Sequence, residues 1–520
     1  MAEILPKHPY VTVVKFAVAA LNRKWEGIFR GYFGAVTRRL TIIVALAGLC
    51  ACTGPERRAP DLRLPAAFEA PAGGEALSTA QLDRWWLLFN DTELNSLEDD
   101  AAKNAPDART AAARVLEAKA TRDSLTAQTL PSGEIKGNAS RQHSYNIGGA
   151  SSSLFPVGGV TDTASGNFNV SWELDLFGRL REARRIANAD QAQARFNIEG
   201  SRASLAASVA DNYFQAKGFA IQLGDARETL RIQQSLQSIA QRKAALGLGA
   251  AADADRLAGE MAQATAQVED LQAQLHAAQR QLLILVGRGI DPTTTLTVDA
   301  QAPAAPRPPS AIPGDLLARR PDVREADAHL RAQAGTGKLR HLAIFPTFTL
   351  LPGLGGSSTT SPGVSFIPPA TLKPSAQTTS LGFWSLGAGV SVPALDIPHL
   401  LYDAKAEDAR TEQAVIAYEK TVQTAYGEAE NALVNLGAGE RAVSVLEDGE
   451  ARSRRAFDAA QKRYSMGLDD LTSALSAEQS WRATRSALTG ERVQALRRAV
   501  QTYKALGGGW AYAASGAKPQ

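Results

Sequence analysis

"QKRYSMGLDDLTSALSAEQ", residues 461–479, repeats the pattern of "QRKAALGLGAAADADRLAGEMAQ", residues 241–263, at an offset of 220. In both stretches a helical sequence rich in Ala, Gln, Lys and Arg reaches a glycine and then resumes as a second helical sequence. The same offset aligns "ILVG" at 284–287 with "KALG" at 504–507. Such self-similarity over half of the chain indicates a tandem duplication, so each half predicts the structure of the other.

Each half is predicted to contain the same elements in the same order. A helix of moderate length (92–130 and 313–342) precedes a strand, a loop and a second strand, and a very long helix (178–246 and 400–464) and a shorter one follow. Helices with such narrow apolar stripes bury little alone, which predicts coiled-coil packing. A stretch of about 68 residues is about 100 Å long, and the two shorter helices stacked end to end nearly match it. We therefore expect a mainly α-helical protein with a small β part, in which a cylinder combines continuous helices with helices made of two pieces.

The first 51 residues predict export. They hold seven Lys and Arg residues against two acidic ones, so the remaining chain carries a net −2 of the total +3. Arg38 and Arg39 precede an apolar run, 40–52, that is too short to span a bilayer and has the length of a secretory h-region. Because the stretch before Arg38 is long for such a signal, one hypothesis places the true translation start at Val36. The nearly neutral remainder lacks the basic surface typical of nucleic-acid binding.

Cys50 and Cys52 are the only cysteines, which excludes a disulfide framework. With Cys52 as the first mature residue, the small Ala51 precedes the cleavage site, whereas Cys50 would place the bulky Leu49 there. The pattern resembles the bacterial lipobox, which implies diacylglycerol and palmitate on Cys52. Thr53, the next residue, is compatible with sorting to the outer membrane. The alternative is a plain signal peptide with incidental cysteines.

Alternation predicts the strands. In "NFNVSWELDL" (167–176) and "WSLGAGVSVPA" (384–394) apolar and polar or small residues alternate with period two. This pattern fits a half-buried soluble sheet and a transmembrane barrel strand equally well. The partner strands near 133–143 and 343–351 alternate less cleanly. The candidate membrane-facing side chains are Phe168, Val170, Trp172, Leu174, Trp384, Leu386, Val390 and Val392.

The export signal, together with the lack of another long apolar segment, favours the transmembrane barrel. Four strands cannot close a barrel, and open sheet edges are not tolerated in lipid. We therefore expect a homotrimer whose twelve strands form one barrel. The loops 144–165 and 352–382, rich in Gly, Ser, Thr and Pro, are expected to face outward from the cell.

These features divide the chain into six parts. They are the leader and lipoprotein signal peptide (1–51), a lipidated extended segment (52–91), the first repeat (92–300), a Pro/Ala-rich linker (301–312), the second repeat (313–506) and a C-terminal tail (507–520). Trp85, Trp86 and Trp510 are expected to pack in a collar around the middle of the cylinder.

"LLARRPDVREADAHLRAQAGTGKLRHLAIFPTFTL", residues 316–350, resembles the second-half signature of TolC-like outer membrane efflux proteins, in particular the NodT-type lipoprotein branch. The family pattern reads L-L-x-R-R-P-D-[VI]-R-x-A-E-x-x-L and then opens a strand with F-P, and Asp327 replaces its Glu. The resemblance covers roughly residues 52–510. Further matches are "CTGPERRAP" (52–60), "WELDLFGRLR" (172–181), "RYSMGL" (463–468) and "YKALGGGW" (503–510).

The resemblance implies a trimeric channel-tunnel, with a β-barrel in the outer membrane and an α-helical barrel across the periplasm. Such channels dock to a periplasmic adaptor protein and an inner-membrane pump, here expected to be of the RND type. The channel catalyses nothing and holds no metal or cofactor apart from the lipid on Cys52. Cargo, expected to be drugs or other small molecules, passes through a water-filled lumen. The alternatives are the channel of a type I protein secretion system and a periplasmic coiled-coil scaffold without a pore.

The resemblance also implies a gate at the periplasmic ends of the helical hairpins, near Gly247 and Gly467. Acidic side chains there ring the pore and attract cations. The second hairpin of the family reads R-Y-x-x-G-L-x-x-Y-L-x-V-L-D-A-Q, and Ser476 stands where its Asp is expected. Asp469 and Asp470 are candidates to replace that carboxylate.

Other residues of the two turns also match the family pattern. Arg463 and Tyr464 match it in the second hairpin, where they are expected to pack or latch the hairpins. In the first hairpin Asp253 and Arg256 match, and Asp255 is an additional acid. The alternative is that these are solvated turn charges that cap helices.

Overall fold

The computed structural model describes residues 58–70, 79–145, 159–247, 249–307, 314, 319–367 and 371–509. The chain divides into two compact units, Met1–Arg57 and Arg58–Gln520, and all described residues belong to the second. The predicted leader, the start at Val36, the lipidated Cys52 and Trp510 lie outside the described residues.

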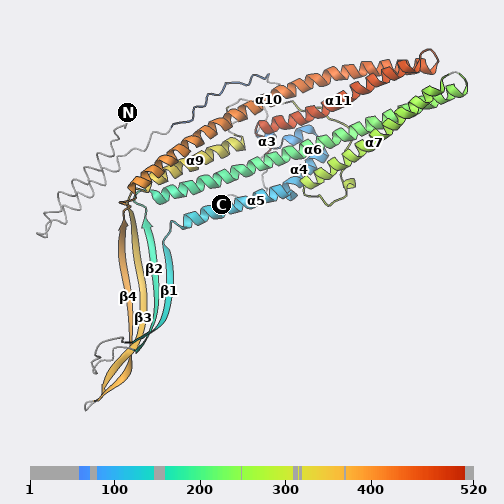
Figure 1. Ribbon diagram of the computed structural model, residues 1–520. Helices are drawn as coiled ribbons and strands as arrows, with labels where there is room; N and C mark the ends of the chain where they lie inside the picture. Colours follow the sequence, from blue (N-terminus) through green and yellow to red (C-terminus); the bar gives the residue numbers. More distant parts are fainter. Residues whose placement is uncertain are drawn as a thin grey trace, which may run out of the picture. The chain divides into compact units, whose positions relative to one another are not determined.

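Two long helices, one from each half of the sequence, run through the second unit (Figure 1). Helix α6 (Arg179–Ala245) has 67 residues and α10 (Ile397–Ser465) has 69, so each is about 100 Å long. Each is followed by a helix of 35 residues, α7 (Ala251–Leu285) and α11 (Leu471–Ala505). These matched lengths agree with the predicted duplication. Although long, none of the described helices is apolar enough to cross a membrane.

Each half also contains a rod made of two helices. Helices α5 (Pro106–Ala127) and α9 (Pro321–Leu342) have 22 residues each. Gly287 follows α7 at a φ of +83°, and a Cβ there would collide with the carbonyl oxygen of Asn104. The end of α7 therefore lies directly against the start of α5, as the predicted two-piece helices require. Gly507, at a φ of +77°, makes the equivalent contact with Arg320 between α11 and α9.

The stretch 92–130, expected to be one helix, is two: α4 (Thr92–Asn104) and α5. Ala105 between them is extended, with φ −56° and ψ 132°. Pro106 explains the break, because proline lacks an N–H and disfavours a helical residue before it. Asp91 caps α4 by accepting the backbone N–H groups of the first turn, at 3.1 Å. Shorter elements are α3 (Thr79–Asp83), η2 (Trp85–Phe89) and η3 (Thr293–Thr295).

Four antiparallel strands form one sheet in the order β1-β2-β3-β4. All four junctions with the helices lie at one end of the sheet, because the residues nearest those junctions pair with one another, as Ser132 does with Ser171 and Thr347 with Ser391. Figure 1 shows the strands leaving the helices together. The bounds are β1 (Ser132–Ser144), β2 (Gly159–Leu174), β3 (Thr347–Ile367) and β4 (Thr371–Ser391).

The strands extend well into the segments predicted to be loops. Residues 159–165 of the expected loop 144–165 pair with β1, and most of the expected loop 352–382 belongs to the ladder between β3 and β4. The prediction was wrong there because it relied on Gly, Ser and Thr content. Backbone pairing satisfies the N–H and C=O groups whatever side chains they carry.

An aromatic core lies beside the middle of the long helices α6 and α10. Trp85 and Trp86 pack in it, as expected. Trp85 is fully buried and stacks on Tyr503 with ring centroids 5.9 Å apart. Lys217 of α6 is buried beside this core and is neutralised by Asp91 at 2.6 Å and Asp299 at 3.1 Å. A buried ammonium needs such partners, so the two carboxylates fix α4 and the segment after α7 on α6.

The arginine pair of the "RRPD" motif holds helices together. Arg320 is buried, and its guanidinium donates to the Ala505 carbonyl at 3.0 Å and to Glu428 at 2.6 Å. It thereby connects the start of α9 with α10 and the end of α11. Arg319 pairs with Asp83 at 2.7 Å.

Candidate functional site

One face of the sheet carries a continuous apolar row. Ile135, Phe168, Leu354 and Trp384 lie directly opposite one another on the four strands. Opposed residues of an antiparallel pair share a face, so these side chains line up across the whole sheet. Trp384 is 79% exposed, and large apolar side chains exposed in such a continuous patch mark an interaction surface.

The predicted membrane-facing residues all follow this pattern. Phe168, Trp172, Trp384, Leu386 and Val390 are exposed on the apolar face, and Val170 and Leu174 are half-buried there. Val392 is exposed one residue beyond the end of β4.

The height of the apolar face can be read along β2. Its even-numbered residues are apolar or glycine from Leu174 to Ala164, and at Asp162 a carboxylate appears, paired with Arg141 at 2.6 and 2.8 Å. Ten residues of strand are about 33 Å long. At the usual tilt of about 40° this corresponds to a band about 25 Å tall, the height found in membrane barrels.

The opposite face of the sheet is more polar. One of its rows contains Glu134, Asn169, Gly353 and Ser385. Leu381 and Phe383 also lie on this face and are exposed, so it is less uniformly polar than the sequence predicted.

The two hairpin tips end in exposed apolar residues. Gly247 and Gly467 follow α6 and α10 at φ values of +70° and +78°, a left-handed conformation that favours glycine at a helix C-terminus. Leu246, Met466 and Leu468 beside them are each about two-thirds or more exposed.

Tyr464 is buried where the two hairpins pack together. Lys243, near the end of α6, donates from Nζ to the Tyr464 carbonyl oxygen at 2.7 Å and lies 4.0 Å from the centre of the Tyr464 ring. Burial raises the pKa of Tyr464, and the charge of Asp253 raises it further. The side chain is therefore held neutral between a cation from α6 and a carboxylate from α7.

Lys243 was not among the predicted gate residues. The duplication marks Lys243 as a residue of the hairpin turn, because it aligns with Arg463 at the 220-residue offset. Arg463 itself points into its own turn, where Nε lies 3.3 Å from Asp469. The two residues therefore share a sequence position but have different partners.

The candidate acids of the second tip are engaged locally. Asp470 caps α11 by accepting the Ser473 N–H at 2.7 Å, and Asp469 accepts the Ser473 hydroxyl at 3.3 Å. Ser476 is exposed on α11. In the first tip Asp255 and Arg256 are exposed, and Arg256 lies 3.5 Å from Glu260.

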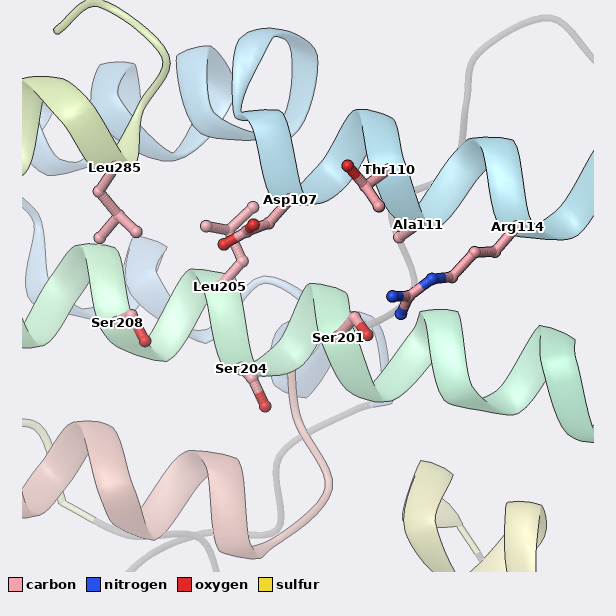
Figure 2. Close-up of a pocket in the computed structure, with 9 residues that line it drawn as sticks. All are labelled: Asp107, Thr110, Ala111, Arg114, Ser201, Ser204, Leu205, Ser208 and Leu285. Atoms are coloured by element: carbon pink, nitrogen blue, oxygen red, sulfur yellow. The ribbon is translucent and has the colours of Figure 1, made fainter.

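A groove of about 310 Å³ lies between α5 and α6 (Figure 2). On α6 its serines are spaced along one helix face, which is opposite to the face that carries Tyr213 and Lys217 into the aromatic core. Leu205, which belongs to that core, and Leu285, which packs against it, form the apolar part of the lining. Its polar lining consists of Asp107, Thr110, Arg114, Ser201, Ser204 and Ser208. In the part of the chain that the structure describes, no group of three or more His, Cys, Asp or Glu side chains could hold a metal ion.

Comparisons with known proteins agree with this geometry. The profile of the family described as "Outer membrane efflux protein" matches residues 97–288 and 312–508. The pyoverdine export outer membrane protein OpmQ of Pseudomonas putida is 27% identical over 474 residues, which cover 91% of this chain and 98% of OpmQ. The cation efflux system protein CusC of Escherichia coli is 27% identical, with 91% and 98% covered. The solved structure of the outer-membrane channel OprN superposes with a TM-score of 0.74 at 27% identity and covers 88% of this chain and 99% of OprN.

Proposed function

Because this chain belongs to the outer membrane efflux protein family and is an outer membrane channel of efflux pumps rather than an enzyme, we propose that it acts as a homotrimer that exports small molecules. The single observation that carries the proposal is the apolar row across all four strands, which continues to both edges of the sheet. A soluble sheet would cover such a row, whereas a barrel wall presents it to lipid.

The edges of the sheet and of the helices support the homotrimer. Strands β1 and β4 each have one neighbour in the sheet. The helices repeat this order, because the α7/α5 rod packs on α6, α6 on the α11/α9 rod, and that rod on α10. The outer strands β1 and β4 are therefore followed, in the helical layer, by the outer α7/α5 rod and the outer helix α10. A second copy that pairs its β4 with β1 would extend both layers at once, and three copies give twelve strands.

Polar surfaces support a water-filled passage. The three serines that line the groove lie on the face of α6 opposite to Tyr213 and Lys217. We assign that face to the lumen of the helical barrel. We likewise assign the sheet face that carries Glu134 and Asn169 to the lumen within the membrane.

The hairpin tips are the proposed periplasmic gate. Tyr464, held by Lys243, would latch the two hairpins together in the narrow state. The acids Asp253, Asp255, Asp469 and Asp470 would supply the negative ring in place of a carboxylate at Ser476. The exposed Leu246, Met466 and Leu468 would form the apolar contact for the periplasmic adaptor, which in turn connects to an inner-membrane pump of the RND type.

The segment before the first repeat supports lipid attachment at Cys52. Residues 58–70 lie along α10, where Arg58 lies 3.2 Å from Glu412 and Ala70 donates to Glu430 at 2.8 Å. Residue 58 is the end of this segment that lies nearer to Ile397, where α10 begins next to the sheet. Glu412, which pairs with Arg58, is about 22 Å from that start. Cys52 precedes this segment by six residues in the sequence, and we propose that it carries the diacylglycerol that anchors the chain in the outer membrane.

Purification from membranes tests this function. We expect a threefold assembly in detergent that dissociates on heating, and discrete conductance in planar bilayers. A deletion strain should become more susceptible to small toxic compounds and keep its secreted-protein profile. A monomer without conductance would refute the channel, and altered secretion with unchanged susceptibility would assign it to protein export instead.

A further inference from the structure

A buried polar cluster lies about three to four helical turns from the tip glycines Gly247 and Gly467. Glu478 of α11 and Gln233 of α6 are both fully buried, at 0% exposure. Glu260 of α7 and Arg482 of α11 complete the cluster. It therefore joins both helices of the first hairpin to the second hairpin, at the packing surface between α6 and α11.

The polar atoms of this cluster are poorly satisfied. Among the described residues, neither carboxylate oxygen of Glu478 and neither polar atom of the Gln233 amide has a hydrogen-bond partner of good geometry. Arg482 Nε lies 3.0 Å from Glu478 Oε1 but is not aligned to donate to it. Buried polar groups are normally paired, so this arrangement needs an explanation.

An ionised Glu478 carboxylate is energetically unfavourable at this buried position. An ionised carboxylate in the interior without hydrogen bonds is strongly disfavoured, whereas the neutral acid costs much less and can donate one hydrogen bond. Burial raises the pKa of Glu478; Arg482 lowers it, the nearby Glu260 raises it, and the Gln233 amide lowers it. Two further charged groups at this level have partners other than Glu478. Arg256 lies 3.5 Å from Glu260, and Glu450 of α10 accepts the Trp481 indole N–H at 2.8 Å.

We propose that Glu478 is a proton-operated lock between the two helical hairpins. The packed arrangement of α11 on α6 binds the proton more tightly, because a fully buried carboxyl group without a well-aligned donor favours the neutral acid. The separated arrangement releases the proton, because water then solvates the carboxylate. The packed state consequently binds more protons than the separated state, so its stability is complete at acid pH and declines as pH rises through the pKa of the packed state.

This lock would regulate the aperture of the gate, and that consequence rests on the proposed channel function. The separation of the hairpins does not depend on it. Hydrogen–deuterium exchange of the assembled protein therefore tests the lock directly, and bilayer conductance tests its consequence. Failure of the first experiment would refute the lock, while failure of the second alone would refute its link to the pore.

The exchange experiment compares segments 228–240 of α6 and 471–485 of α11 between pH 5 and pH 8, after correction for the intrinsic pH dependence of exchange. The wild type should lose protection in both segments several-fold as pH rises. Glu478→Gln, an isosteric neutral variant, should remain protected at every pH. Glu447→Gln, which changes a half-exposed carboxylate of α10 that pairs with Arg492, should behave like the wild type.

A second variant keeps the test independent of the folding of Glu478→Gln. Arg482→Met removes the cation that favours ionisation, so its loss of protection should occur at higher pH than in the wild type. The same pH dependence in the wild type, Glu478→Gln and Arg482→Met would overturn the proposal, as would wild-type protection that does not change with pH.

Discussion

Replacing Lys243 by methionine should open the gate, and the structure allows the size of the effect to be worked out. Lys243 makes a charged hydrogen bond to the Tyr464 carbonyl at 2.7 Å and a cation–π contact at 4.0 Å. A charged hydrogen bond is worth about 1.5 kcal/mol at the low end, and a partly exposed cation–π contact about 0.5–1 kcal/mol. Their loss should shift the equilibrium between latched and open hairpins by about 2 kcal/mol, which is about thirtyfold.

Single-channel recording in planar bilayers measures this shift as an increase in open probability. Lys462→Met is the matched control. Lys462 is exposed at the C-terminal end of α10, two residues before Tyr464, so its replacement should leave the open probability unchanged. Tyr464→Leu removes the ring and keeps the carbonyl, so its effect should be smaller than that of Lys243→Met. The double variant Lys243→Met/Tyr464→Leu should raise the open probability by less than the sum of the two separate effects, because both changes remove the same contact. Equal open probabilities in Lys243→Met, Lys462→Met and the wild type would refute the latch.

Three further predictions follow from the sheet, the helix junction and the turns. Trp384→Lys should destabilise the membrane-inserted protein by about 2–4 kcal/mol, since it places a charge on the lipid face, while Ser385→Lys on the opposite face should not; resistance to denaturant in detergent distinguishes them. Arg320→Met should lower the free energy of unfolding by about 1–3 kcal/mol, because the Ala505 carbonyl loses its donor, whereas the exposed Glu428 carboxylate stays solvated; an unchanged midpoint of thermal unfolding would contradict this. Gly467→Ala should cost about 1–2 kcal/mol at its positive φ, whereas Gly427→Ala, in the middle of α10 with no neighbour near the added methyl group, should stabilise by up to about 1 kcal/mol; equal thermal shifts would contradict the turn argument.

Some of the candidate site could be read from the sequence because it depends on local periodicity. The alternation in 167–176 placed Phe168 and Trp172 on one face, and the sheet keeps them there because side chains of a strand alternate strictly. The glycines at 247 and 467 marked the hairpin tips because a left-handed residue is needed after each long helix.

Other parts could not be read, because they depend on residues far apart in the chain. Lys243 contacts Tyr464, which is 221 positions away. The duplication aligns Lys243 with Arg463 but does not reveal this partner, because Arg463 pairs within its own turn. Glu478 and Gln233 meet only because two helices from different halves pack together.

The sequence by itself determined the duplication, the kinds of elements and their order, because each half repeats the same local pattern of helix, strand and glycine turn. It also determined which strand residues face together. The tertiary structure alone decided how far the strands extend, that Lys243 is the cation that contacts Tyr464, and that the Glu478 carboxylate is buried. The physical reason is that backbone pairing, ion pairing and desolvation depend on distance in space, and long helices bring together residues that no local pattern relates.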